Sequence, residues 1–123
     1  MLRYTGSKTA EDYSDAVIKA YSELLVKFNA LSAKWVQFDE PYLVHDLSKA
    51  DIALFEKLYR GILSAKNDVK VLLQTYFGDI RDCYKSICAL DFDGIGLDFI
   101  EGKKTVELVN ENGFASNKIL LQE

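Results

Sequence analysis

The 123-residue sequence predicts an α/β fold, in which helices and parallel strands alternate along one chain. Segments with helical spacing of apolar residues alternate with short runs rich in β-forming residues, in the order α-β-α-β-α-β-α-β. Successive strands begin about 23 to 35 residues apart, which is the period of βα units joined by right-handed crossovers. The length suits a single domain, residues 1–123, and the 49% hydrophobic content is normal for a chain that buries a core.

The first helix is expected over residues 9–31. Thr9 and Asp12 form a capping signal at its start, and apolar residues then recur every three or four positions. This stripe consists of Tyr13, Ala16, Val17, Ala20, Tyr21, Leu24, Leu25 and Phe28. A short strand follows in "WVQFDEP", where apolar and polar residues alternate until Pro41 ends the ladder.

The second half of the chain repeats this alternation. Ser48 and Asp51 give a second helix the same capping signal, and its apolar stripe runs to residue 65. The segment "VKVLLQTYF", residues 69–77, is nearly continuous in apolar residues, as expected of a strand covered on both faces. The pattern then predicts a helix over residues 79–89, a glycine-bearing strand over 93–102, a short helix over 105–110 and a final strand over 118–122.

Four parallel strands allow two architectures. They could form a small open sheet, or half of a (β/α)₈ barrel, a fold that needs about 200 to 250 residues. Length alone favours the open sheet. In both architectures ligands meet the carboxyl-terminal ends of the strands, so candidate site residues are sought there.

Composition excludes several classes of partner. Fifteen Lys and Arg against nineteen Asp and Glu give a net charge of −4, and no basic cluster is dense enough to follow a phosphate backbone, so no nucleic acid is expected. The amino-terminal segment lacks the core of a signal peptide, and no stretch reaches the about 18 apolar residues of a membrane span. We therefore expect a cytoplasmic protein that binds no membrane.

The two cysteines, Cys83 and Cys88, lie in one predicted helix at a spacing that suits neither a redox pair nor a zinc knuckle. We expect both to be buried, reduced thiols.

The candidate binding residues are Asp39, Gln74, Tyr76 and Asp98, all near carboxyl-terminal ends of predicted strands. The two-residue period of a strand places them on the face opposite the helix-packing residues. Carboxylate and amide oxygens accept hydrogen bonds from an ammonium group, so one interpretation is a rim that binds a polar or cationic ligand group. The alternative is that these polar side chains simply face water.

Other motifs carry weaker signals. Glu40 follows Asp39 but points to the other face of the strand, so the two carboxylates do not form an acid/base pair. His45 has no second His or Cys at metal-ligand spacing, and no Ser or Cys nucleophile can be assigned to it, so a surface histidine is expected. "DGIGLD" lacks the third glycine of a dinucleotide-binding loop. The residues therefore suggest no catalytic group and no metal ligand.

Three segments, taken in order, carry a family resemblance: "WVQFDEPYLVHDL", "VKVLLQTYFGDI" and "DGIGLDFIEGKKTVEL". They resemble signatures of the cobalamin-independent methionine synthases, and the resemblance extends from about Tyr13 to Lys118. Those enzymes consist of two face-to-face (β/α)₈ barrels. The resemblance therefore implies that this chain is roughly half of a barrel, and specifically part of the N-terminal one.

The activity that the resemblance implies is methyl transfer from a methyltetrahydrofolate polyglutamate to homocysteine. In that family the C-terminal barrel binds the zinc that activates homocysteine, while the N-terminal barrel, an apparent duplicate, helps to hold the folate's glutamate tail. The zinc-binding His-x-Cys pair of the C-terminal barrel corresponds here to Gln74 and Tyr76, and a carboxylate ligand corresponds to Asp98. An amide and a phenol do not replace imidazole and thiolate. We therefore expect no zinc or other cofactor on this chain, and expect Asp39 to organise the barrel mouth.

This comparison predicts a fragment without methyl transfer activity of its own, either an expressed fragment or a truncated gene product. Folate and homocysteine are expected as ligands only in a full-length context. A half barrel exposes two strand edges and its inner face, so we also expect self-association that closes the barrel, most simply as a two-fold dimer. The rival hypothesis is a standalone, non-catalytic α/β module that binds a small ligand or a protein through the same rim.

Overall fold

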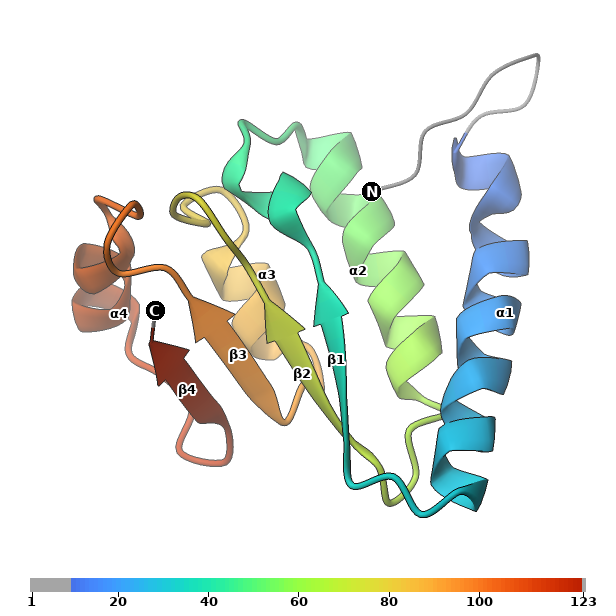
Figure 1. Ribbon diagram of the computed structural model, residues 1–123. Helices are drawn as coiled ribbons and strands as arrows, with labels where there is room; N and C mark the ends of the chain where they lie inside the picture. Colours follow the sequence, from blue (N-terminus) through green and yellow to red (C-terminus); the bar gives the residue numbers. More distant parts are fainter. Residues whose placement is uncertain (1–9, 123) are drawn as a thin grey trace.

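The computed structural model describes residues 10–122, which form a four-stranded parallel sheet covered by helices (Figure 1). The strands lie in the order β1-β2-β3-β4, and each neighbouring pair is parallel. The predicted α/β class is thus confirmed. In chain order the elements are α1 (Ala10–Ala30), β1 (Trp35–Asp39), the 3₁₀ turn η1 (Pro41–Val44), α2 (Lys49–Leu63), β2 (Lys70–Gln74), α3 (Tyr84–Ala89), β3 (Gly94–Leu97), α4 (Thr105–Asn112) and β4 (Ile119–Gln122).

The strand order is that of a barrel segment. Each strand lies beside the next one in sequence, and α2, α3 and α4 lie behind the sheet in the view of Figure 1. A doubly wound open sheet instead reverses its strand order and carries helices on both faces. The sheet is therefore consistent with half of a (β/α)₈ barrel, with one face toward the helices and the other toward the barrel interior.

The main core lies between the sheet and the helices. Its sheet residues are at most 2% exposed, and they are Val71, Leu73, Ile95 and Leu97. From α2, Phe55 and Ile62 pack against them, and Phe92 enters from the segment before β3. Because side chains alternate across a strand, this burial leaves the intervening residues on the opposite face.

Helix α2 begins where the sequence predicts. The Ser48 hydroxyl accepts a hydrogen bond from the Asp51 N–H at 3.1 Å, and the Asp51 carboxylate accepts one from the Ser48 N–H at 3.0 Å. This reciprocal capping box satisfies two N–H groups that the helix itself leaves without partners.

Two strands are shorter than predicted because specific contacts turn the chain. β2 ends at Gln74 rather than at residue 77, and Phe77 has a φ of 62°, a left-handed conformation that ends extended pairing. β3 ends at Leu97 rather than at residue 102. There the Asp98 carboxylate accepts hydrogen bonds from two N–H groups further along the chain, those of Ile100 and Glu101, and folds the segment back.

The helix predicted over residues 79–89 begins only at Tyr84. The residues before it form turns in which Ile80 is buried and Arg81 forms ion pairs with Asp79 and Asp46. Helical periodicity predicts the second part of this segment correctly and the first part wrongly.

Helix α1 matches its predicted range, although its start signal at Thr9 lies outside the described residues. Its apolar stripe is buried along one side only: Leu25 is 0% exposed, whereas Tyr21 is 42% and Leu24 is 38% exposed. A Cβ on Gly61 of α2 would lie 2.7 Å from the Ile18 Cγ2 atom, so the two helices are in close contact there. α1 thus rests against α2, and the other side of its stripe has no cover among residues 10–122.

Two lysines stabilise the amino-terminal ends of the strands through hydrogen bonds and an ion pair. Lys118 Nζ donates to the carbonyl oxygens of Leu90 and Phe92, both at 2.7 Å, and burial lowers the pKa of this ammonium group. Lys66 Nζ lies 3.2 Å from Asp93 Oδ2. In (β/α)₈ barrels this end contributes mainly to stability, so candidate site residues are expected at the other end.

Both cysteines are free thiols, as predicted, with Cys83 buried and Cys88 half-buried. Burial raises the pKa of the Cys83 thiol to about 12, which makes it unreactive. None of the helices described within residues 10–122 combines the length and the apolar composition that crossing a membrane requires.

Candidate functional site

The two adjacent carboxylates at the end of β1 point in opposite directions, as the strand period predicts. Glu40 faces the helices, and its Oε1 atom accepts a hydrogen bond from the Tyr59 hydroxyl at 2.6 Å. Burial, reinforced by the Glu40 charge, raises the pKa of Tyr59 far above its ordinary value. Asp39 faces the barrel interior instead. The two carboxylates therefore do not form an acid/base pair, and Asp39 is the one on the barrel-facing side.

Asp39 is the centre of a polar cluster at this mouth. Its Oδ1 atom accepts hydrogen bonds from the Tyr76 hydroxyl at 2.9 Å and from Gln37 Nε2 at 2.7 Å. Gln37 Nε2 also lies 3.3 Å from the Tyr76 oxygen. Within residues 10–122 both bonds to the carboxylate end on Oδ1, so Oδ2 remains available to a cationic ligand group.

Gln37 is the member of this mouth cluster that sequence analysis missed. It shares the inward face of β1 with Asp39, and this parity was the available signal. The alternation of side chains along β1 does not predict the contact with Tyr76, because that contact depends on the register between β1 and β2.

Gln74 lies beside Asp39 in the sheet, but its side chain packs against other protein atoms and is closed to solvent. The register pairs Asp39 with Gln74 and Gln74 with Gly96. The Gln74 side chain is 5% exposed, covers Gly96, and donates from Nε2 to the Thr75 carbonyl at 3.1 Å. Gln74 therefore fills the space that the missing Gly96 side chain leaves, beneath the mouth cluster.

Asp98 is likewise engaged by its own protein. Its side chain is 6% exposed, and Oδ1 accepts the Ile100 and Glu101 N–H groups at 2.9 and 2.8 Å. The Glu101 N–H, followed by those of Ile100, Phe77 and Gly78, lowers the pKa of this carboxyl against the opposing effect of burial. Asp98 thus joins the loop after β2 to the loop after β3. Of the four predicted rim residues, only Asp39 and Tyr76 are brought into direct contact.

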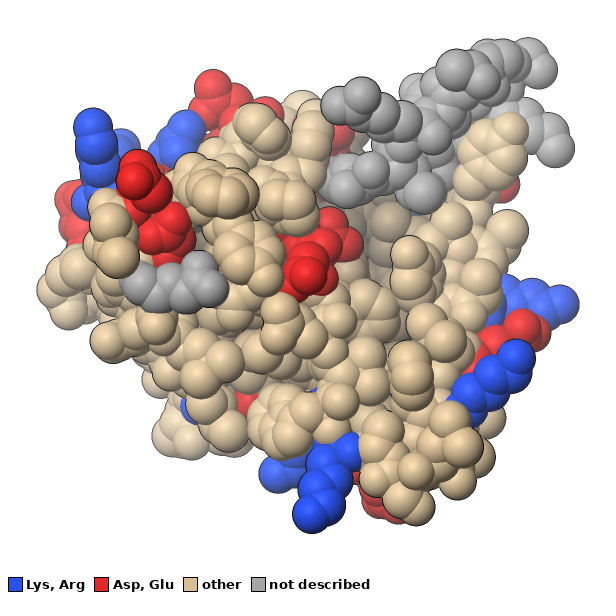
Figure 2. Space-filling view, in the orientation of Figure 1, with Lys and Arg blue, Asp and Glu red and all other residues tan. Residues whose placement is uncertain are grey.

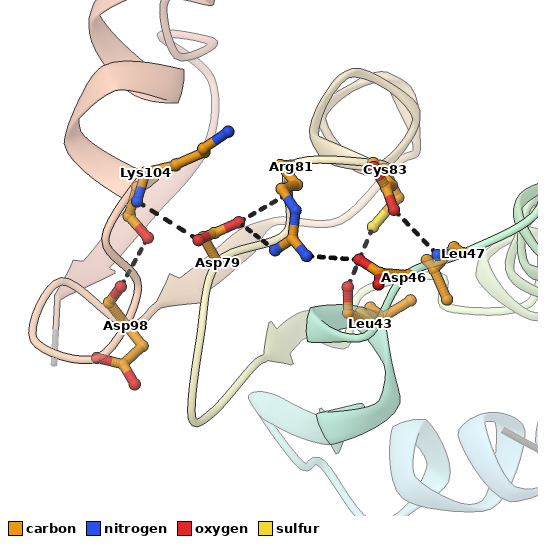
Figure 3. Close-up of polar contacts among 10 residues, drawn as sticks. Leu43, Asp46, Leu47, Asp79, Arg81, Cys83, Asp98 and Lys104 are labelled. Atoms are coloured by element: carbon orange, nitrogen blue, oxygen red, sulfur yellow. Dashed lines mark hydrogen bonds and ion pairs between the residues drawn. The ribbon is translucent and has the colours of Figure 1, made fainter.

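A second polar network crosses the same end of the sheet (Figure 3). Arg81 donates to Asp46 at 2.6 Å and to Asp79 at 2.9 Å, and Asp79 accepts the Lys104 N–H at 3.4 Å. Burial alone would raise the pKa of Asp79, but the hydrogen bonds from Arg81 and Lys104 lower it. The network connects the loops that follow β1, β2 and β3, although sequence analysis assigned none of its members.

The donor groups at the mouth do not fit a zinc ion. Gln74 uses its amide on a main-chain carbonyl, Tyr76 donates to a carboxylate, and Asp98 holds a loop. Zinc sites in proteins use imidazole, thiolate and carboxylate ligands arranged around one point. Among the residues that the structure describes, no three His, Cys, Asp or Glu side chains gather in this way. His45 is exposed at the surface, 5.1 Å from the Tyr42 ring.

Comparison with known proteins identifies the family. Residues 2–122 match the family described as "Cobalamin-independent synthase, N-terminal domain". The chain is 49% identical over 120 residues to a 5-methyltetrahydropteroyltriglutamate–homocysteine methyltransferase of Campylobacter jejuni subsp. doylei, an alignment that covers 98% of this chain. It is 47% identical over 117 residues to the enzyme of the same name from Lactococcus lactis subsp. cremoris, with 95% of this chain covered.

Both alignments extend over 16% of the relative, so the chain corresponds to a part of these enzymes. This confirms the resemblance seen in the three sequence signatures and favours it over a standalone module. The chain belongs to the cobalamin-independent methionine synthase family and matches its N-terminal domain.

Proposed function

We propose that this chain supplies four strands of the N-terminal barrel of a cobalamin-independent methionine synthase, which transfers a methyl group from methyltetrahydrofolate polyglutamate to homocysteine. The observation that carries the proposal is the family match over residues 2–122, made by a chain whose sheet has the strand order of a barrel segment. The names of the relatives, which specify a folate methyl donor and homocysteine, support the reaction. We place this function in the cytoplasm.

In this proposal the chain alone transfers no methyl group. The reaction needs an activated homocysteine thiolate, and the groups that Gln74, Tyr76 and Asp98 present at the strand ends do not fit the zinc ion that would activate it. The chain's own part is structural and positional. It holds the Asp39 carboxylate at the mouth and orders the surrounding loops through Arg81 and Asp98.

Asp39 is the residue through which this part acts on a ligand. Tyr76 and Gln37 both donate to Oδ1 of this carboxylate, which leaves Oδ2 to accept a hydrogen bond from an amino or other cationic group of a ligand. A charged hydrogen bond of this kind contributes about 1.5–3 kcal/mol, so its loss would lower binding or kcat/KM about 10-fold or more.

The experiment is a domain graft with two matched variants. The 120 matched residues of the Campylobacter jejuni relative are replaced by this chain, and methionine formation is measured with homocysteine and a methyltetrahydrofolate polyglutamate. We expect an active graft, a loss of about 10-fold for Asp39→Asn, and no loss for Asp68→Asn, the same change at the opposite end of the strands.

The purified chain provides the second measurement. We expect no methionine and no stoichiometric zinc by elemental analysis. Turnover by the chain alone, or a graft that folds with native stability but is inactive, would contradict the proposed function. Equal activity of the Asp39→Asn and Asp68→Asn grafts would contradict the role of Asp39.

A further inference from the structure

An apolar groove runs between α1 and the edge of the sheet. It has a volume of about 510 Å³ and is lined mostly by apolar side chains of α1, α2 and β1, with Gln37, Asp39 and Glu40 as polar residues on the β1 side. The apolar side chains from α1 include the exposed part of its stripe, Tyr21 and Leu24. In an α/β barrel a helix covers two adjacent strands. Here α1 covers β1 on one side, and the groove is the place that a second strand would occupy.

The β1 main chain faces this groove with the groups that pair strands. Toward β2, the Lys34 carbonyl accepts the Lys70 N–H, and the Glu40 N–H donates to the Gln74 carbonyl. Alternation along a parallel strand therefore turns the N–H and C=O groups of Trp35, Gln37 and Asp39 the other way. Among residues 10–122 no strand pairs with that side of β1, so the described part of the chain leaves this edge open to a parallel strand.

The strand at the opposite edge of the sheet, β4, has the composition that the groove requires. Its sequence is ILLQ, without a charged residue. Ile119 and Leu121, on the barrel-facing side, are 50% and 42% exposed, while Leu120 packs toward the helix-side core. A strand that is apolar on both faces is suited to lie between a helix layer and a barrel interior.

The barrel-facing side of the sheet is also hollow. Trp35 and Leu72 line a depression of about 500 Å³ together with Ile119, Leu121 and Gly94. Figure 2 views this side, where uncharged side chains form most of the surface over the strands. Eight strands close a barrel whose interior is just wide enough for side chains to fill it. Four more strands would therefore fill this depression.

We propose that two copies of this chain assemble into a closed eight-stranded barrel, in which β4 of each copy lies in the groove between α1 and β1 of the other. A two-fold axis along the barrel axis keeps all eight strands parallel and makes both seams identical. This two-fold arrangement pairs the outer edges of β1 and β4, covers the exposed stripe of α1 and encloses Trp35. This inference rests on the sheet and the groove, not on methyl transfer.

The chain carries its own probe for this closure, because Trp35 is its only tryptophan and is 43% exposed on the barrel-facing side. Sedimentation velocity should give a mass of two 13.9-kDa chains as the concentration rises toward about 100 µM. Over the same range Trp35 emission should move to shorter wavelength, and acrylamide should quench it less. The two transitions should share one midpoint.

Two variants on one helix locate the interface. Leu24→Glu puts a charge into the groove, while Val26→Glu makes the same change at a 51% exposed position of α1 that does not line the groove. We expect Leu24→Glu to raise the dissociation constant by about 10-fold or more and Val26→Glu to leave it unchanged. Circular dichroism checks that both remain folded. If Leu24→Glu unfolds the chain, Leu121→Glu, on the barrel-facing side, makes the same test.

Three results would overturn the proposal. These are a monomer at every concentration, a dimer in which the Trp35 emission does not change, and open chains of three or more copies, which edge pairing without closure would produce. A dimer that both Leu24→Glu and Leu121→Glu leave intact would overturn it as well.

Discussion

The two faces of the sheet are built from the same four strands yet differ in burial. On the helix-facing side, Leu73 and Ile95 are at most 1% exposed, whereas on the barrel-facing side Trp35 and Ile119 are 43% and 50% exposed. Strand propensity is common to both faces and cannot explain this difference. What differs is the cover: helices lie on one face, and the described residues place nothing on the other. We infer that the helix-facing side stabilises the fold, while the barrel-facing side serves binding and assembly.

The strongest test of this contrast compares two neighbouring leucines of β2. Leu73 is 0% exposed against the helices, and Leu73→Ala should lower the free energy of unfolding by about 2–5 kcal/mol. Leu72 lies on the barrel-facing side and is only half-buried, so Leu72→Ala should cost about 1 kcal/mol or less. Urea unfolding at low protein concentration measures both. Equal losses would refute the contrast between the faces.

Asp98 tests whether the mouth loops depend on one carboxylate. Asp98→Ala removes an acceptor from several N–H groups and should cost about 1.5–3 kcal/mol at neutral pH. The folded-state pKa of Asp98 lies below its ordinary value of 3.8, so its contribution is complete above that value and is lost as the pH falls through the folded-state pKa. Urea unfolding between neutral and acidic pH should show the stabilities of the two proteins converging in acid. A gap that stays constant would contradict this.

Two tyrosine–carboxylate pairs repeat the contrast on a smaller scale. Tyr59 donates to Glu40 on the helix side and is 4% exposed, so Tyr59→Phe should cost about 1–2 kcal/mol. Tyr76 donates to Asp39 at the open mouth, and Tyr76→Phe should change stability by about 0.5 kcal/mol or less. Thermal unfolding of the two variants distinguishes them. A larger loss of stability for Tyr76→Phe than for Tyr59→Phe would contradict the contrast between the two faces.

A single added methyl group tests the packing of Gln74 over Gly96. Gly96→Ala would collide with the Gln74 amide that covers this glycine, and moving the amide should cost about 1 kcal/mol. In a Gln74→Ala background the same change should cost less, because the obstacle is gone. Additive losses in this double-mutant cycle would show that Gln74 does not occupy the Gly96 space.

Local periodicity predicted the features that depend on one segment alone, namely side-chain direction along a strand and the start of a helix. The opposite directions of Asp39 and Glu40 follow from the two-residue period, and the α2 capping box follows from the spacing of Ser48 and Asp51. It did not predict contacts that depend on inter-strand register or on loop conformation. The hydrogen bond from Tyr76 to Asp39 joins the segment after β2 to the end of β1, and that from Arg81 to Asp46 joins the loops after β2 and β1.

Loop conformation also explains the two misplaced strand ends. Periodicity extended β2 to residue 77, although Phe77 adopts a left-handed conformation that glycine would adopt more easily. It predicted Asp98 as a candidate binding residue of the rim, and it did not predict that main-chain N–H groups hold this carboxylate. In both cases a tertiary contact, invisible in sequence spacing, decides the role of the residue.

The backbone conformation at Phe77 makes the chain susceptible to proteolysis at this position. Phe77 is 81% exposed with a φ of 62°, and the Asp98 carboxylate, whose pKa the Phe77 N–H helps to lower, belongs to the next loop. When this turn opens, the segment can relax to the extended form in which a protease binds its substrate. Chymotrypsin, which cleaves after aromatic residues, should therefore cut first at Phe77 and divide the sheet into halves of two strands each.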